Sequence, residues 1–213
     1  MIESSVEVFN QVNDRLMPSI SIILPYKNRE VKRAEKCFSS LENQTFKDFE
    51  VVLVDYGSDE CFSKEMEELC SCYKFVRYNY NETTGMVWNR AHALNTGIKI
   101  SLSTKFILTS DIDLIYSSNL LETLLSQYEE KHVLYSRVHL IPENYSDWDL
   151  LDIKKAEFLK TDEGGKGGLQ FIEKNYLVEI QGFDEFFALW GVEDRDIFNR
   201  LEMSGIKCKW INE

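Results

Sequence analysis

Short apolar runs that alternate with helical patterns are the feature that most constrains how this chain can fold. Residues 20–24 and 51–54 are nearly continuous in apolar side chains, as strands buried on both faces are. Between them, residues 30–41 place apolar side chains at helical spacing on one face. Because such alternation is typical of a mostly parallel sheet covered by helices on both faces, the sequence predicts an α/β fold.

The alternation continues along the chain, less regularly in the second half. It predicts helices at 62–72, 87–100, 120–128, 150–159 and 193–203, and strands at 74–78, 106–109, 133–140 and 169–172. Ser58 or Asp59 is expected to cap the helix at 62–72. The glycine-dense stretch 164–168 precedes a strand and lacks the Lys-Ser/Thr ending of a P-loop. A mobile loop and a close backbone approach to a ligand both stay open as its explanation.

Composition and charge bound the function. The 213 residues suffice for one large domain, and 44% of them are hydrophobic, enough for a proper core. The formal net charge of −12 argues against a nucleic-acid-binding surface, which needs clustered Lys and Arg. It leaves room for a phosphate-bearing small substrate, because a metal ion can supply positive charge locally.

The cysteines and the lengths of the apolar runs indicate the cellular compartment in which the chain is expected to work. The five cysteines are odd in number and show no paired metal-ligand spacing, so reduced, semi-buried thiols are expected. Residues 1–18 lack the apolar centre of a signal peptide, and no apolar run approaches the roughly 20 residues of a membrane span. We therefore expect a reducing, cytoplasmic location.

Polar clusters follow three of the predicted strands, at 25–29, 55–59 and 111–113. In open α/β sheets, ligands bind outside the carboxyl ends of the strands. The sequence therefore predicts a nucleotide-type site where these clusters meet.

Asp111 and Asp113 stand one residue apart, just beyond the strand predicted at 106–109. Two carboxylates so placed can share one hard divalent cation, which would neutralise a diphosphate and polarise its leaving oxygen. For such a triplet alone, an acidic surface turn is the simpler explanation. The metal assignment therefore depends on the rest of the chain.

A second acidic group lies at the start of the last predicted helix, in Trp190-Gly191-Val192-Glu193-Asp194. Acids in a first helical turn have a structural explanation, because they favour the positive end of the helix dipole. That explanation does not account for the Trp-Gly pair before them. Trp faces pack against sugar C–H surfaces, and an adjacent carboxylate suits a general base for a sugar hydroxyl.

Five motifs, in this order, resemble those of family 2-type glycosyltransferases of the GT-A fold. They are Ile22-Ile23-Leu24-Pro25-Tyr26-Lys27-Asn28-Arg29, Val54-Asp55-Tyr56-Gly57-Ser58-Asp59, Asn89-Arg90-Ala91 with Asn95 and Gly97, Ser110-Asp111-Ile112-Asp113, and Gly182-Phe183-Asp184-Glu185 followed by Trp190-Gly191 and Glu193-Asp194. The last block looks most like the branch that holds galactosyltransferases, chondroitin polymerases and predicted capsule-biosynthesis transferases. The resemblance implies a single GT-A domain over 1–213, with a nucleotide-binding half at 1–115 and an acceptor-binding half at 116–213.

The resemblance also implies residue roles. Asp194 would be the catalytic base, with Glu193 binding sugar hydroxyls, and Asp113 with Asp111 would bind Mn²⁺ or Mg²⁺. Asp55 would hydrogen-bond the base, typically uracil, and Arg90 would approach the diphosphate. The full donor-binding set would be Pro25, Tyr26, Arg29, Asp55, Ser58, Arg90, Asp111, Trp190 and Gly191.

The function implied is inverting transfer of a sugar from a UDP-sugar to a glycan or lipid-linked acceptor, in surface polysaccharide (capsule-type) biosynthesis. Peripheral association with the inner membrane face fits a lipid-linked acceptor. Simpler alternatives stay open for three residues. Asp55 could cap the next helix, Arg90 could be solvated and paired with Glu82, and Trp190 could be a core residue.

One departure from the resembling branch concerns the metal. Those transferases often supply a further metal-binding His after a strand beyond the Glu-Asp helix, whereas this chain ends at 209–213 within that predicted strand. Three explanations stay open. The chain is truncated before that His, the metal is bound through Asp113 and water, or the domain binds nucleotide-sugar or glycan without turnover.

Overall fold

The protein is described by a computed structural model over residues 17–103, 105–136, 138, 168–189 and 191–211. Its strands are β1 (Ile20–Tyr26), β2 (Phe49–Asp55), β3 (Val76–Tyr80), β4 (Phe106–Ser110), β5 (His132–Tyr135), β6 (Leu169–Glu173) and β7 (Lys207–Trp210). Its helices are α2 (Val31–Glu42), α3 (Glu60–Ser71), α4 (Arg90–Ile100), α5 (Leu120–Gln127), α6 (Lys174–Glu179) and α7 (Glu193–Met203).

The strands form one mixed sheet in the order β3-β2-β1-β4-β6-β5-β7. Pairing is parallel throughout except for β6, which runs antiparallel to both of its neighbours, β4 and β5. The predicted α/β fold with a mostly parallel sheet is therefore confirmed.

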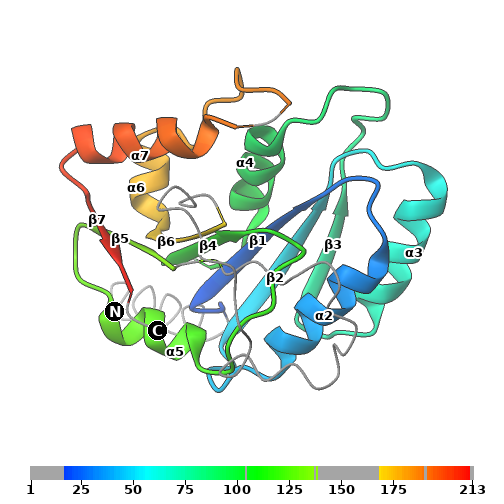
Figure 1. The fold of residues 1–213 in the computed structure, drawn as a ribbon, viewed down its shortest axis with the longest axis horizontal. Coiled ribbons are helices and arrows are strands. Elements are labelled where there is room, and N and C mark those ends of the chain that lie inside the picture. The colour runs from blue at the N-terminus through cyan, green and yellow to red at the C-terminus, as the bar shows by residue number, and fades with distance from the viewer. Residues whose placement is uncertain (1–16, 104, 137, 139–167, 190, 212–213) are drawn as a thin grey trace, which may run out of the picture.

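The helices cover the two faces of the sheet, as Figure 1 shows with α2 and α5 on one side and α4, α6 and α7 on the other. The alternating side chains of β1 explain the two hydrophobic cores, because successive residues of a strand point to opposite faces. Ile22 and Leu24 pack in the core with α2, α3 and α5, whereas Ile23 packs in the core with α4, α6 and α7. Gly97 lets α4 lie close to the sheet, since a Cβ there would come within 2.2 Å of Cγ2 of Ile23.

Several element boundaries differ from the predicted ones. The helix predicted at 87–100 begins at Arg90, because Asn89 is in an extended conformation and its side chain accepts a hydrogen bond from the backbone N–H of His92. The strand predicted at 74–78 lies instead at Val76–Tyr80, the stretch that pairs in register with Val51–Asp55. The strand predicted at 133–140 ends at Tyr135.

The structure also differs from the predictions at the N-cap of α3 and in the second half of the chain. Asp59 is the N-cap residue of α3, as one of the two predicted alternatives had it, but its side chain makes no capping hydrogen bond. The short helix α6 was not predicted. The helix predicted at 150–159 and most of the glycine-dense stretch 164–168 lie outside the described residues. In the described part of the chain, no helix is long and apolar enough to cross a membrane.

Candidate active site

The three polar clusters meet at one edge of the sheet, as the sequence predicted. β1 is parallel to β2 with Tyr26 opposite Asp55, and parallel to β4 with Ile23 opposite Thr109. The carboxyl ends of all three strands therefore open on the same side, and Asp111 emerges directly after the last residue of β4. This edge is where ligands bind in open α/β sheets.

Hydrogen bonds of Asn28 connect the loop after β1 to the loop after β2. Its backbone N–H donates to Oγ of Ser58 (2.9 Å), and its side-chain amide exchanges hydrogen bonds with the backbone N–H and carboxylate of Asp59 (2.7 and 3.1 Å). Asn28 adopts a φ of 47°, in the left-handed region where Asn is among the better tolerated residues. These hydrogen bonds hold the loops after β1 and β2 together at the candidate site.

Asp55, the last residue of β2, holds the loop after β2 through hydrogen bonds of its buried carboxylate. Its carboxylate is fully buried and accepts hydrogen bonds from the backbone N–H of Ser58 (2.8 Å) and the hydroxyl of Tyr78 (2.7 Å). A buried carboxylate needs such partners, and here they hold the β2 loop against β3. In this arrangement Asp55 positions the loop, while direct hydrogen bonding to a nucleotide base stays a prediction.

The predicted pocket residues of β1 lie in its buried end. Pro25 and Tyr26 are both buried, and the Tyr26 hydroxyl donates to the backbone carbonyl of Arg29 (2.8 Å). Arg29 itself is exposed and reaches the acidic turn after β4. Contact of Pro25 and Tyr26 with a donor nucleotide stays a prediction.

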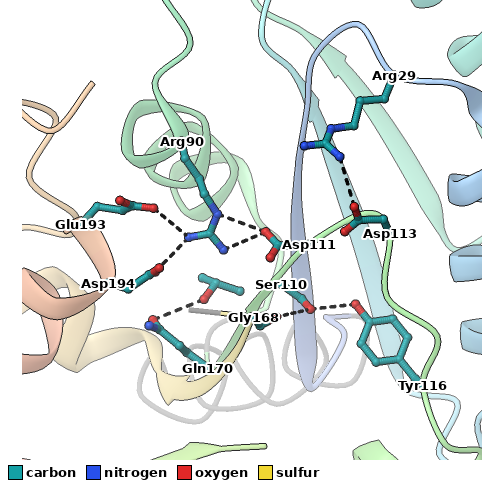
Figure 2. Close-up of polar contacts among 11 residues, drawn as sticks. Arg29, Arg90, Ser110, Asp111, Asp113, Tyr116, Gly168, Gln170, Glu193 and Asp194 are labelled. Carbon is teal, nitrogen blue, oxygen red and sulfur yellow. Dashed lines mark hydrogen bonds and ion pairs between the residues drawn. The ribbon is translucent and has the colours of Figure 1, made fainter. Parts of the chain in front are cut away.

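Arg90, the first residue of α4, lies at the centre of the site (Figure 2). It donates through Nε and Nη2 to Oδ1 of Asp111 (3.1 and 3.0 Å) and through Nη1 to Oδ1 of Asp194 (3.0 Å). Nη1 also lies 3.7 Å from Oε1 of Glu193. The Arg90 side chain is only 12% exposed, so the alternative of a solvated arginine paired with Glu82 is wrong.

Burial and neighbouring charges shift the pKa values of Asp194, Asp111 and Arg90. Burial raises the pKa of Asp194 above its usual value, and Arg90 offsets this only in part. The pKa of Asp111 is raised by burial in the same way. Burial alone would lower the pKa of Arg90, yet the surrounding carboxylates raise it on balance. A carboxylate with a raised pKa is a better proton acceptor, which is the property that a general base needs.

Asp113 forms ion pairs with two other arginines, Arg29 and Arg33. Its Oδ2 lies 3.1 Å from Nη1 of Arg29 and 3.5 Å from Nη1 of Arg33, whereas Asp111 faces Arg90. The sequence analysis did not identify Arg33, which lies in the first turn of α2, four residues after Arg29.

The acidic pair Asp111 and Asp113 offers carboxylate oxygens to a metal ion. Among the residues that the structure describes, no group of three or more His, Cys, Asp or Glu is placed to hold a metal ion. Asp111 and Asp113 each use one carboxylate oxygen in the ion pairs above, so the second oxygen of each takes no part in them. Mg²⁺ typically takes one or two carboxylates together with substrate phosphates and water, and this donor set fits that mode.

Two asparagines join α4 to the segment that leads into α7. Asn95 accepts from the backbone N–H of Phe183 (2.9 Å) and donates to Phe183 O and Oε1 of Glu185 (both 2.8 Å). The side chain of Asn89 donates to the backbone carbonyl of Glu185 (2.7 Å). These bonds tie the start of α4 to the loop that leads to Asp194.

The turn before α7 has an unusual backbone. Gly191 and Val192 both have positive φ values, 89° and 78°, and Val192 is the N-cap residue of α7. A branched residue in the left-handed region is uncommon and carries strain. Trp190, assigned a sugar-binding role from the resemblance, lies outside the described residues.

Lys27 is a further residue that sequence reasoning left without a role. Its Nζ donates to the backbone carbonyls of Tyr56 (2.8 Å) and Met86 (3.3 Å) and lies 5.2 Å from the centre of the Tyr56 ring. Lys27 thereby links the loops that follow β1, β2 and β3. Only the tertiary structure brings these three loops together.

Comparison with known proteins supports the resemblance. The profile of glycosyl transferase family 2 matches residues 21–186, more than half of the chain. The GalNAc(5)-diNAcBac-PP-undecaprenol beta-1,3-glucosyltransferase of Campylobacter jejuni is 29% identical over 80% of this chain and 56% of its own length. Glycosyltransferase GlyG of Streptococcus pneumoniae is 29% identical over 62% of this chain and 41% of its own length. An uncharacterised glycosyltransferase of Rickettsia bellii is 34% identical over 55% of this chain and only 16% of its own length. The chain thus spans about half or less of these relatives.

Solved structures share the fold. The mannosyltransferase PcManGT of Pyrobaculum calidifontis, solved with GDP-Man and Mn²⁺, superposes with a TM-score of 0.68 at 16% identity, covering 92% of this chain and 55% of the other. GalNAc-T7 with UDP, GalNAc and Mn²⁺ gives a TM-score of 0.71 at 16% identity over 93% of this chain and 42% of the other. These superpositions establish the GT-A fold. The family profile also establishes the family: the chain belongs to glycosyl transferase family 2.

Proposed function

We propose that the protein is an inverting glycosyltransferase that moves a sugar from a UDP-sugar to a glycan or lipid-linked acceptor. The observation that carries the proposal is the convergence of Asp111, from the end of β4, with Glu193 and Asp194, from the start of α7, around one buried guanidinium. This arrangement supports Asp194 as the base, because it lies close to the strand ends that would hold the donor.

Asp194 acts as the general base in the proposed reaction. It takes the proton of an acceptor hydroxyl while that oxygen forms a bond to the anomeric carbon of the donor sugar. The bond from that carbon to the nucleoside diphosphate breaks on the opposite face, so the configuration inverts in a single displacement. Glu193, largely buried next to Asp194 in the chain, would orient a sugar hydroxyl.

Positive groups of the chain face the leaving diphosphate. Arg90 and Arg29 can each turn from their carboxylate partners toward phosphate oxygens, which guanidinium groups bind in bidentate fashion. Asp111 and Asp113 would hold Mn²⁺ or Mg²⁺, and this ion would supply further neutralisation of the diphosphate.

The finer assignments rest on relatives and on motif likeness. The Campylobacter relative is named for an undecaprenol-linked acceptor, which supports a lipid-linked acceptor here. Uridine as the donor base, membership of the galactosyltransferase and chondroitin-polymerase branch, and a role in capsule-type polysaccharide rest on the motifs described above.

Nucleoside diphosphate release tests the proposal, measured for a panel of UDP-sugars with Mn²⁺ and an acceptor panel that includes undecaprenyl-diphosphate-linked saccharides. Asp194→Asn keeps an oxygen to accept from Arg90 but removes the base, and kcat should fall by about 10² to 10⁴-fold. Asp196→Asn is the matched control, since this acid lies on the same helical turn and pairs with Arg200 instead (2.7 Å). It should stay within about threefold of wild type, because it leaves the base in place.

Asp113→Ala tests the metal assignment in the same assay. The metal concentration needed for half-maximal release should rise, because one of two proposed ligands is lost. Donor binding that needs no metal and leads to no turnover with any acceptor would instead identify a binding domain and refute the proposal.

A further inference from the structure

Exposed apolar side chains gather on two segments beside the site. Of the ten large hydrophobic side chains that are exposed in the described part of the chain, five lie on these segments. We call them the apolar rim: Met86, Val87, Phe186, Leu189 and Val192. Single exposed hydrophobic residues are ordinary on soluble proteins, whereas a contiguous group marks an interaction surface.

Hydrogen bonds hold the two segments of the apolar rim together, although about 100 residues separate them. The backbone N–H of Leu189 donates to the carbonyl of Trp88 (2.8 Å), and the Asn89 side chain donates to the carbonyl of Glu185 (2.7 Å). The backbone N–H of Phe186 is held by Oδ1 of Asp184 (2.9 Å). The exposed side chains of the apolar rim therefore stand on two backbone segments that hydrogen bonds hold together.

The apolar rim adjoins the candidate active site. Val87 lies three residues before Arg90, and Val192 immediately precedes Glu193. Both segments border the start of a helix that carries site residues, and in Figure 1 they lie near the upper end of α4. A surface that covers the apolar rim would lie next to Asp194.

We propose that the apolar rim inserts into the surface of a lipid bilayer and so brings Asp194 to a lipid-linked acceptor. This inference rests on the proposed function, because a polyprenyl-linked acceptor presents its sugars at a membrane surface. The charges point to apolar insertion rather than electrostatic attraction. The net charge is −12, and Asp184 and Glu185 immediately precede Phe186, so anionic headgroups would be repelled.

Vesicle sedimentation tests the inference, with large unilamellar vesicles of phosphatidylcholine as the probe. Wild-type protein should sediment with the vesicles, and replacing part of the lipid by phosphatidylglycerol should not increase binding. The double variant Phe186→Ser with Leu189→Ser should bind about tenfold more weakly, because two large apolar groups are lost from the interface. Met203→Ser is the matched control, since Met203 is as exposed as Phe186 (87% and 88%) but lies at the far end of α7.

Several results would overturn the inference. They are failure of wild-type protein to bind, an equal loss in Met203→Ser, binding that requires anionic lipid, and burial of the apolar rim in a dimer that Phe186→Ser dissociates. All these variants change exposed side chains, and an unaltered thermal midpoint would confirm that they fold.

Transfer assays separate this inference from the proposed function. The double variant should transfer sugar to a water-soluble acceptor as wild type does, but lose at least about tenfold in transfer to an acceptor embedded in vesicles. Transfer to the soluble acceptor without vesicle binding refutes membrane docking alone. Vesicle binding through the apolar rim without any transfer refutes the proposed function alone.

Discussion

Replacing Arg90 by methionine, which fills similar space without charge, should destabilise the fold strongly. Removing one partner of a buried ion pair costs about 3–5 kcal/mol, because the remaining charge stays buried and unpaired. Here the carboxylates differ in exposure: the side chain of Glu193 is 7% exposed, that of Asp194 28% and that of Asp111 39%. Since water reaches two of the three, we expect a loss of about 3 kcal/mol in the free energy of unfolding.

Arg29→Met is the matched control for that loss. Arg29 makes a pair of the same kind and length with Asp113, at 3.1 Å, but its side chain is 56% exposed. Exposed ion pairs contribute about 0.2–1 kcal/mol, so this variant should lose no more than that. Urea unfolding of both variants without metal or donor, followed by circular dichroism, measures the difference.

The loss in Arg90→Met should also depend on pH. Burial already raises the pKa values of Asp111 and Asp194, and removing Arg90 removes the group that lowers them. A carboxyl whose folded-state pKa lies above its unfolded value destabilises the fold at high pH, and this penalty shrinks as pH falls toward the unfolded value near 4. The difference between variant and wild type should therefore be smaller near pH 5 than near pH 8. Equal losses for the two arginine variants, or a loss that does not change with pH, would refute the reasoning.

Two further predictions concern stability and thiol reactivity. Gly57→Ala should lose more than about 1 kcal/mol, because Gly57 has a φ of 66° and a Cβ there would lie 2.4 Å from a backbone nitrogen. Gly205→Ala is the control, because Gly205 has a φ of 82° but a Cβ there would meet no atom within 4 Å, so only the backbone strain remains. Equal losses of stability for the two variants in thermal unfolding would show that the predicted clash at Gly57 does not matter. Burial raises the pKa of the Cys70 thiol to about 12, so at pH 8 it should react with an aromatic disulfide reagent only after unfolding, whereas the exposed Cys61 should react at once. Prompt modification of Cys70 in the native protein would show that the helix opens locally.

The strand-end residues of the candidate site could be predicted because local pattern determines them. Apolar runs located β1, β2 and β4, and polar residues at their ends marked one edge of a parallel sheet. Boundaries that depend on neighbours were less accurate. The start of β3 is set by its register with β2, and the start of α4 by the side-chain cap of Asn89.

Local sequence pattern was enough to predict the fold class, the strand ends where the candidate site lies and the chemical types of its residues. Which opposite charge each of these residues pairs with depends instead on tertiary packing. Asp111 and Asp113 are neighbours in the chain, yet one faces Arg90 and the other Arg29. Arg90 and Asp194 are about 100 residues apart, yet they form one partly buried pair. The physical reason is that periodicity fixes which face a side chain occupies, whereas packing of α4 and α7 against the sheet fixes which side chains from distant segments become partners.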